Sequence, residues 1–97
     1  MNMPMHTREA RKPITTSSRL RATLEKVETN SRQIAEAGSD TQDLLRLLSF
    51  QRQLGNQALD LGILLTRERG ASWGTIAKGL GLSPQALEQR MRRLAAH

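Results

Sequence analysis

Residues 72–94, SWGTIAKGLGLSPQALEQRMRRL, constrain the fold more than any other stretch of the chain. Ser72 and Ser83 are residue types that cap the start of a helix. Pro84 suits a first helical turn, because its missing N–H would have no partner there. Gly81, between the two caps, can adopt the positive φ that a tight turn requires. The stretch therefore predicts two short helices joined by a tight glycine turn.

Apolar residues recur on one face of each of these helices, which we expect to run from Trp73 to about Leu80 and from Ser83 to Ala95. The expected inward-facing residues are Ile76, Ala77, Leu80, Leu82, Leu87, Met91 and Leu94. We expect Trp73 to fill the core or the helix crossing, and not to act as a stacking platform for bases.

The segment IAKGLGLSPQALEQRMRRL resembles the DNA-binding helix-turn-helix of bacterial regulators, especially the promoter-binding C-terminal domain of sigma factors. The resemblance extends over about residues 61–97. The positions that match the family pattern are Ile76, Ala77, Leu80, Gly81, Ser83, Leu87, Arg90, Met91 and Arg93. The chain carries no other sigma-factor domain and is too short to hold the others. We therefore expect a small stand-alone regulator and not a sigma factor.

The polar face of the last helix carries the chemistry of base recognition. In a helix-turn-helix, the outward N-terminal positions of the second helix meet base edges in the major groove. Gln pairs bidentately with adenine, Arg pairs with guanine, and Glu accepts from cytosine N4. The candidate base-reading residues are Gln85, Glu88, Gln89 and Arg92.

A second set of polar residues suits phosphate contacts, which position a protein on DNA without specifying sequence. The candidates are Ser72, Thr75, Lys78, Ser83 and Arg93. Arg90 lies on the flank, where packing and a phosphate clamp are both open. The alternative for the arginines is simple solvation of a C-terminal helix.

Upstream, a long helix is predicted from about Ser18 to Ala37, with Gly38 suited to its end. The candidates for its N-cap are Thr16, Ser17 and Ser18. Its apolar residues are Leu20, Leu24, Val27 and Ile34, with Ser31 in the gap. This alternating spacing of four and three residues predicts a narrow seam that packs against one partner helix.

A second long helix is predicted from about Asp40 to Arg69, and Gly70 is its expected left-handed cap. Ser39 followed by Gln42 has the pattern of a capping box. The connection is short, so the two long helices should be antiparallel neighbours.

The apolar residues of this second helix spread over roughly 200° of its circumference, against about 100° for a one-sided helix. They are Leu44, Leu45, Leu47, Leu48, Leu54, Ala58, Leu59, Leu61, Ile63 and Leu65. The helix should therefore contact the first helix, the C-terminal unit and a second copy of the chain. Gly55 and Gly62 lie within the arc and permit close helix approach. A break at Gly55–Asn56 is the alternative.

Composition narrows the class of function. The chain of 97 residues has a net charge of +6, and 12 of its 15 basic residues are Arg, which favours nucleic acid as a partner. Phe50 and Trp73 are the only aromatic residues, so binding of single strands by stacking is disfavoured. The absence of Cys excludes thiolate metal sites, and His6 and His97 have no cluster of ligands beside them.

Other classes of function lack their sequence signatures. The chain has no nucleophile–base pair, paired carboxylates or phosphate-cradling glycine loop, so we expect no enzyme activity and no cofactor. No apolar run approaches the roughly 20 residues of a membrane span, and residues 1–13 have no signal-peptide pattern. We therefore expect a cytoplasmic protein without a membrane partner.

Residues 1–16 form a predicted flexible basic arm, because Pro4 and Pro13 interrupt any helix. Arg8, Arg11 and Lys12 could place the arm in a minor groove. The alternative is an ordinary disordered terminus.

Together these patterns predict an all-α fold in which residues 17–97 form one helical domain. Residues 17–69 would be an antiparallel hairpin that dimerises, and residues 70–97 a helix-turn-helix. The leading hypothesis is a dimeric, sequence-specific reader of double-stranded DNA that regulates transcription. The alternatives are a protein-interaction module, such as a partner of the transcription machinery docked on the helix of residues 40–69, and a non-specific nucleoid-organising DNA binder.

Overall fold

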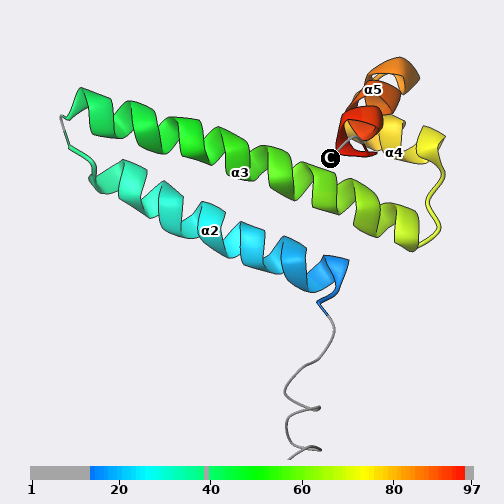
Figure 1. Ribbon diagram of the computed structural model, residues 1–97, viewed down its shortest axis with the longest axis horizontal. Helices are drawn as coiled ribbons and strands as arrows, with labels where there is room; N and C mark the ends of the chain where they lie inside the picture. The colour runs from blue at the N-terminus through cyan, green and yellow to red at the C-terminus, as the bar shows by residue number, and fades with distance from the viewer. Residues whose placement is uncertain (1–13, 39, 96–97) are drawn as a thin grey trace, which may run out of the picture.

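The computed structural model describes residues 14–38 and 40–95. Within these residues the chain forms four helices and no strand, so the predicted all-α fold is confirmed. The helices are α2 (Thr16–Glu36), α3 (Thr41–Glu68), α4 (Trp73–Leu80) and α5 (Pro84–Ala95) (Figure 1). Three predicted features lie outside the described residues. They are the predicted arm apart from its last three residues, Ser39 of the predicted capping box, and the two histidines.

The long helices α2 and α3 lie side by side and antiparallel (Figure 1). At one end, the hydroxyl of Thr16 in the first turn of α2 donates a hydrogen bond of 2.6 Å to the Glu68 carboxylate in the last turn of α3. At the other end, Gly38 takes a φ of 68°, in the left-handed region that favours glycine. The two helices are therefore in register over nearly the whole length of α2.

The start of α2 differs from the prediction. Thr15 is the N-cap, and none of the three predicted candidates takes that position. Thr15 has an extended backbone, so its hydroxyl can accept from the Ser18 N–H at 3.0 Å. The Ser18 hydroxyl in turn accepts from the Thr15 N–H at 3.2 Å, which completes a capping box.

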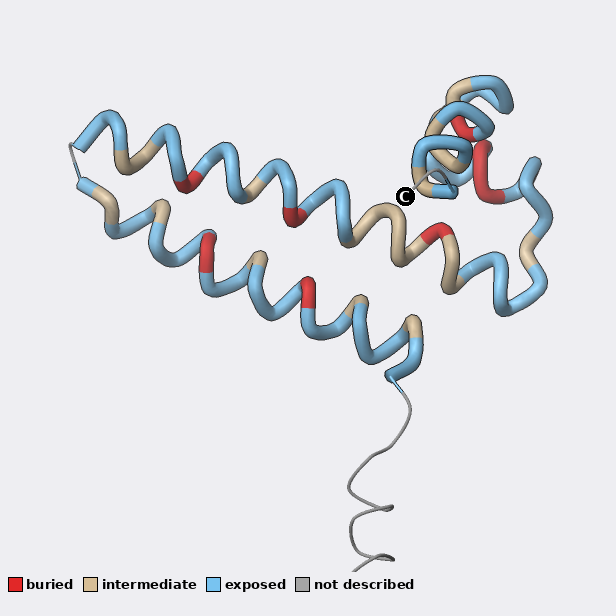
Figure 2. Tube along the Cα trace, in the orientation of Figure 1, coloured by how far each residue is buried: buried red, intermediate tan, exposed pale blue. Residues whose placement is uncertain are grey.

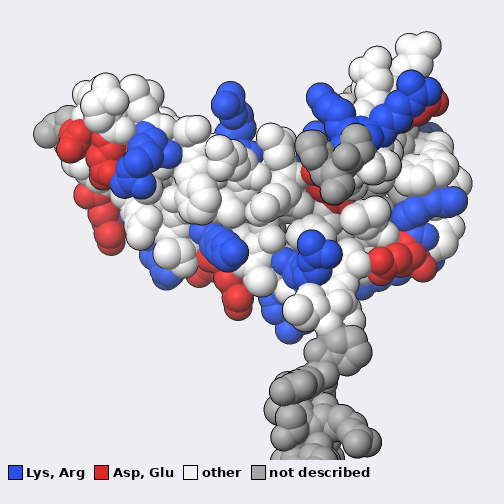
Figure 3. Space-filling view, viewed as in Figure 1, with Lys and Arg blue, Asp and Glu red and all other residues white. Residues whose placement is uncertain are grey.

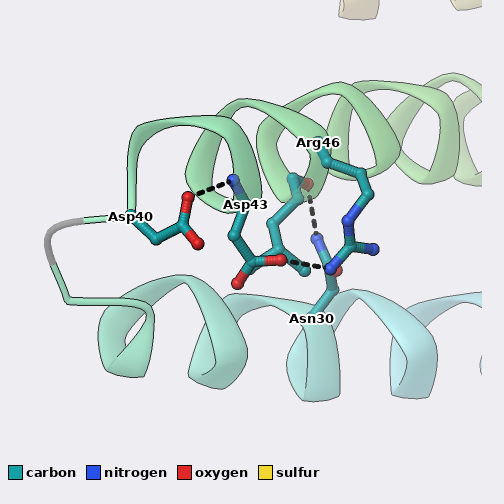
Figure 4. Close-up of polar contacts among 5 residues, drawn as sticks. Asn30, Asp40, Asp43 and Arg46 are labelled. Carbon is teal, nitrogen blue, oxygen red and sulfur yellow. Dashed lines mark hydrogen bonds and ion pairs between the residues drawn. The ribbon is translucent and has the colours of Figure 1, made fainter.

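The start of α3 is capped by Asp40, whose carboxylate accepts from the Asp43 N–H at 3.1 Å (Figure 4). The Asp43 carboxylate also pairs with Arg46. α3 therefore begins at Thr41 and ends at Glu68, one residue inside each predicted bound. Gly70 follows with a φ of 95°.

The seam by which α2 packs on α3 is shifted from the predicted one. Leu24 is 50% exposed, whereas Thr23 and Asn30 are buried (Figure 2). The residues that face α3 therefore follow the series Leu20, Thr23, Val27, Asn30 and Ile34. The prediction was right for Leu20, Val27 and Ile34, but it placed Leu24 and Ser31 where Thr23 and Asn30 lie, because it gave no weight to buried polar residues.

The donor groups of these two buried polar residues form hydrogen bonds, whereas the side-chain oxygen of Asn30 has no partner among the described residues. The Thr23 hydroxyl donates to the Arg19 carbonyl on its own helix at 3.0 Å. The Asn30 amide donates across the hairpin to the Leu47 carbonyl at 3.0 Å (Figure 4) and to the Gln51 side chain at 2.7 Å. Asn30 therefore ties the register of α2 to one position on α3.

Helix α3 continues through Gly55 without a break, contrary to the alternative prediction. The close helix approach predicted at Gly55 and Gly62 is absent among the described residues. A Cβ atom at either glycine would meet nothing within 4 Å. The glycines lie on a face of α3 that neither α2 nor the C-terminal helices cover.

The C-terminal half of α3 packs against α4 and α5. The buried cluster there consists of Ile63, Ile76, Ala77 and Leu87, flanked by Leu59, Ala71, Leu82 and Met91. Leu80 was predicted to face inward, but it is 39% exposed. This residue ends the eight-residue α4, where the helix leaves the cluster.

The body is elongated, with a Cα radius of gyration of 17.9 Å, whereas a compact chain of this length has about 12 Å. The half of the hairpin that lies away from α4 and α5 consists of only two helices (Figure 2). Two helices cannot enclose a core. Leu45 and Leu48 on this half of α3 are accordingly about half exposed.

We expect Asn30→Ala to lower the free energy of unfolding by about 1–3 kcal/mol, because the buried Leu47 carbonyl and the part-buried side-chain oxygen of Gln51 each lose a donor. Urea unfolding at fixed protein concentration measures the change. Thr29→Ala, on an exposed neighbouring position, is the control and should leave stability unchanged or slightly higher, since Ala is the better helix former. An Asn30→Ala value within about 0.5 kcal/mol of the parent would contradict the assigned role.

Candidate nucleic-acid interface

The turn between α4 and α5 depends on Gly81, which adopts φ 68° and ψ 26°. The Gly81 N–H donates to the Lys78 carbonyl at 3.2 Å, and the Leu82 N–H donates to the Ala77 carbonyl at 2.9 Å. This pair of bonds satisfies the last carbonyls of α4 in the manner of a left-handed helix cap. The turn is therefore closed by backbone bonds that need a residue free to take positive φ.

Both predicted serine caps are present. Ser72 accepts from the Thr75 N–H at 3.1 Å, and Ser83 accepts from the Ala86 N–H at 3.1 Å. The Ser72 hydroxyl also donates to the Thr75 hydroxyl at 2.9 Å. Each cap fixes the direction in which its helix starts, and so the angle at which α5 leaves the turn.

Arg90, whose role the sequence left open, anchors α5 to α3. Its Nε donates to the Asp60 carboxylate at 2.6 Å, and its NH2 group donates to the Asn56 carbonyl at 3.1 Å. Both side chains of the ion pair are mostly buried, at 19% and 25% exposed. Arg90 therefore packs against α3, and its guanidinium is already occupied.

The opposite face of α5 is open. All four candidate base-reading residues are exposed, and they lie on the side of the helix away from the buried Leu87. Gln85 and Gln89 are one turn apart, so their amides lie on one face of the helix. The structure therefore brings the candidate readers together on one face of α5, with Gln85, Glu88 and Gln89 in its first two turns and Arg92 in its last turn.

Glu88 and Arg92 differ from the two glutamines because they pair with each other at 2.7 Å. Both side chains are largely exposed, and an ion pair of this kind contributes little stability. It can therefore open at small cost when a base edge or phosphate competes for either partner. While closed, it neutralises the one acidic group on this face.

Of the two predicted places for Trp73, the core is wrong, and the residue lies where α4 and α5 meet. It is 42% exposed and forms one wall of a groove of about 490 Å³ beside α5. Met91, Glu88 and Arg92 border the same groove. The Arg67 guanidinium lies 4.7 Å from the centre of the indole ring and donates to the Ala71 carbonyl at 2.9 Å. Arg67 and Trp73 together fix the loop that enters α4.

Sequence reasoning missed Arg67, because its partner lies beyond a loop and no periodic pattern connects the two. A cation over an indole face contributes about 0.5–1 kcal/mol at an exposed site. Arg67 therefore acts on the entry to α4 and on the position of the groove wall.

The five candidate phosphate-binding residues are all exposed, but they do not share one surface. Thr75 borders a second groove between α3 and α4, whereas Gly74, its neighbour, borders the groove beside α5. Lys78 and Arg93 form no ion pair among the described residues. These two cations are the ones that a phosphate could engage without displacing a carboxylate.

Charge is uneven along the chain. Residues 70–95 carry four basic residues and one acidic residue. Their net charge, four minus one, is half of the net charge of +6 of the whole chain. Figure 3 shows Lys and Arg side chains over the unit of α4 and α5 and also along the hairpin, where acidic residues accompany them. The C-terminal unit is therefore the more strongly basic part of the described chain.

In residues 14–38 and 40–95, no group of three or more His, Cys, Asp or Glu side chains could hold a metal ion. No helix in that part of the chain is long and apolar enough to cross a membrane.

No family model matches the chain, and neither a curated protein nor a solved structure matches it significantly.

We expect Arg90→Ala to lower the free energy of unfolding by about 1.5–3 kcal/mol, because it leaves the Asp60 carboxylate half-buried without its donor. Chemical denaturation measures the change. The control is Arg93→Ala, an exposed arginine on the same helix, which should shift stability by less than about 0.5 kcal/mol. Equal effects of the two substitutions would show that the Asp60 contact is not the cause.

Proposed function

We propose that this chain is a sequence-specific double-stranded DNA-binding protein, a small dimeric transcriptional regulator that inserts α5 into the major groove. The observation that carries the proposal is the construction of α5. Its inner face is held by Leu87 and Arg90, while Gln85 and Gln89 project into solvent near its N-terminal end. That is the part of a recognition helix that meets base edges.

The chemistry of the exposed face supports reading and not only attachment. Two glutamines one turn apart can each pair bidentately with adenine, and Arg92 can pair with guanine. Lys78 and Arg93 supply phosphate contacts, and the hydroxyls of Ser72 and Ser83 lie at the starts of the two helices, where phosphate is favoured. The proposed protein is a non-catalytic, cytoplasmic binder without a cofactor.

The proposed dimer would present two copies of α5. Two-fold symmetric half-sites would then lie about one helical turn of DNA apart, or a multiple of that spacing. Elongation of the monomer and its half-exposed leucines support a second copy.

The selection of bound duplexes from a random pool, at stated salt, tests the proposal. We expect a consensus with two related half-sites. Gln85→Ala with Gln89→Ala should lower the preference for the selected duplex over a random one by at least about tenfold, since each bidentate contact contributes about 1–3 kcal/mol. The matched control is Gln53→Ala with Gln57→Ala, an exposed pair at the same spacing on α3. If the parent protein binds selected and random duplexes equally, sequence reading is excluded.

The salt dependence of affinity tests the phosphate contacts separately. We expect Lys78→Ala and Arg93→Ala each to reduce the slope of log affinity against log salt by about 1, because each removes one neutralised phosphate. Arg32→Ala, an exposed arginine on α2, should leave the slope unchanged. Slopes that respond equally to all three substitutions would indicate non-specific coating of DNA.

The second candidate function is docking on a protein of the transcription machinery through the apolar face of α3, which the exposure of Leu45 and Leu48 favours. Reversal of charge at Arg92 and Arg93 discriminates the two functions. It should abolish duplex binding if α5 reads DNA, and it should leave a docking function intact.

A further inference from the structure

One face of α3 has no partner among residues 14–38 and 40–95. α2 packs on the side of α3 that carries Leu47, and α4 and α5 pack on the side that carries Ile63. Between these sides lie Leu48, which is 46% exposed, and the two open glycines, Gly55 and Gly62. These three residues are spaced by seven, so they form a nearly straight stripe along the helix.

The stripe ends in a groove at Gly62. The groove has a volume of about 360 Å³ and lies between α3 and α4. Its walls are apolar and mainly small: Ala58, Gly62, Thr66, Gly79 and Leu80. Because nothing lies within 4 Å of a Cβ at Gly62, the bottom of the groove can accept a side chain from outside.

The side chain proposed to fill this groove is that of Leu48, which is also on α3. Leu48 lies seven residues before Gly55 and Gly62 lies seven residues after it. Gly55 is also at the middle of α3. If two α3 helices cross antiparallel at Gly55, each Leu48 therefore meets the partner's Gly62. Such a contact is self-complementary, as a two-fold interface must be.

We propose that a second copy of this chain occupies the stripe, with α3 antiparallel to the partner's α3 across Gly55 and Leu48 inserted into the partner's groove at Gly62. The inference rests on the homodimer of the proposed function and specifies its interface. The charges at the ends of α3 agree with this orientation. Asp40 and Asp43 outnumber Arg46 at the start of α3, and Arg67 and Arg69 outnumber Glu68 at its end, so a net acidic end lies beside a net basic end. A parallel pair would place like charges together.

The surfaces beside the stripe complete the interface. From Leu48 to Gly62 the stripe is about 21 Å long and, at a helix width of about 10 Å, covers roughly 210 Å². A stable dimer buries about 800 Å² on each partner, so flanking surface must contribute. A two-fold axis at Gly55 brings Leu45, 54% exposed, toward the partner's α4, where Leu80 is 39% exposed. These two exposed leucines supply part of the remaining area.

The proposed two-fold dimer determines where its two copies of α4 and α5 lie. A two-fold axis perpendicular to α3 at Gly55 leaves the side of α3 that carries α4 and α5 pointing in the same direction in both copies. Both copies of α5 therefore face the same side of the dimer. The dimer contact also covers the wall of the groove that carries Thr75. Thr75 is therefore assigned to the dimer interface, and the phosphate contacts are left to the other four candidates.

Sedimentation equilibrium at micromolar concentrations tests the interface with two substitutions. Leu48→Asp places a charge in the partner's apolar groove, and Gly62→Leu puts a side chain into that groove at a position where the added Cβ atom meets nothing within 4 Å. We expect each to raise the dimer dissociation constant at least about 100-fold. The control is Leu24→Asp, an equally exposed leucine on α2, which should not change the dissociation constant. Circular dichroism confirms that the variants remain helical.

Cross-linking tests the orientation, because the chain has no cysteine and single thiols can be introduced cleanly. With a short bis-maleimide linker, Gly55→Cys chains should link to each other. Leu48→Cys chains should link to Gly62→Cys chains in a mixture, and not to themselves.

The outcomes separate this inference from the function on which it rests. A dimer that Leu48→Asp leaves intact, or Leu48→Cys chains that link to themselves, would overturn the interface while leaving the dimer in place. A monomeric parent protein would overturn both the interface and the dimer. Duplex selection reads DNA recognition independently, since a single α5 can still select a half-site.

Discussion

The structure depends on α3 serving two sets of contacts at once. One side of the helix holds α2 through the bond from Asn30 to the Leu47 carbonyl. Another side holds α4 and α5 through the apolar cluster around Ile63 and the ion pair between Asp60 and Arg90. Because one uninterrupted helix carries both contacts, the position of α5 is set by the same rigid element that carries the hairpin. A break at Gly55 would have uncoupled them.

The polar groups divide into those that hold the fold and those that remain free to bind. Arg90 and Arg92 are only two residues apart on α5, yet Arg90 is mostly buried against α3, whereas Arg92 is largely exposed and pairs only with Glu88. Helical geometry causes the difference, since two residues along a helix turn a side chain by about 200°. The same substitution at these two neighbouring arginines therefore acts on the packing of the fold in one case and on an exposed surface in the other.

Much of the C-terminal unit could be predicted from sequence because its determinants are local. Ser72, Gly81 and Ser83 act on backbone groups within a few residues of themselves, so their pattern predicts the bounds of α4 and the start of α5 without knowledge of any distant contact. The all-α class followed in the same way from the spacing of apolar residues. Prediction was weaker for α2, where Thr23 and Asn30 are buried in place of Leu24, because a polar residue enters a seam only when a distant partner satisfies it.

The sequence by itself therefore determined the helices, the serine caps of α4 and α5 and the set of residues exposed on α5, since these follow from backbone bonds and from the 3.6-residue period. Only the tertiary structure decided which of those residues are free. It joined Arg90 to Asp60, thirty positions away, placed Trp73 on a groove wall under Arg67, and separated Thr75 from the face of α5. Each of these depends on the angle at which α4 and α5 meet α3. That angle is fixed by packing in the cluster around Ile63, and no local pattern in the chain encodes it.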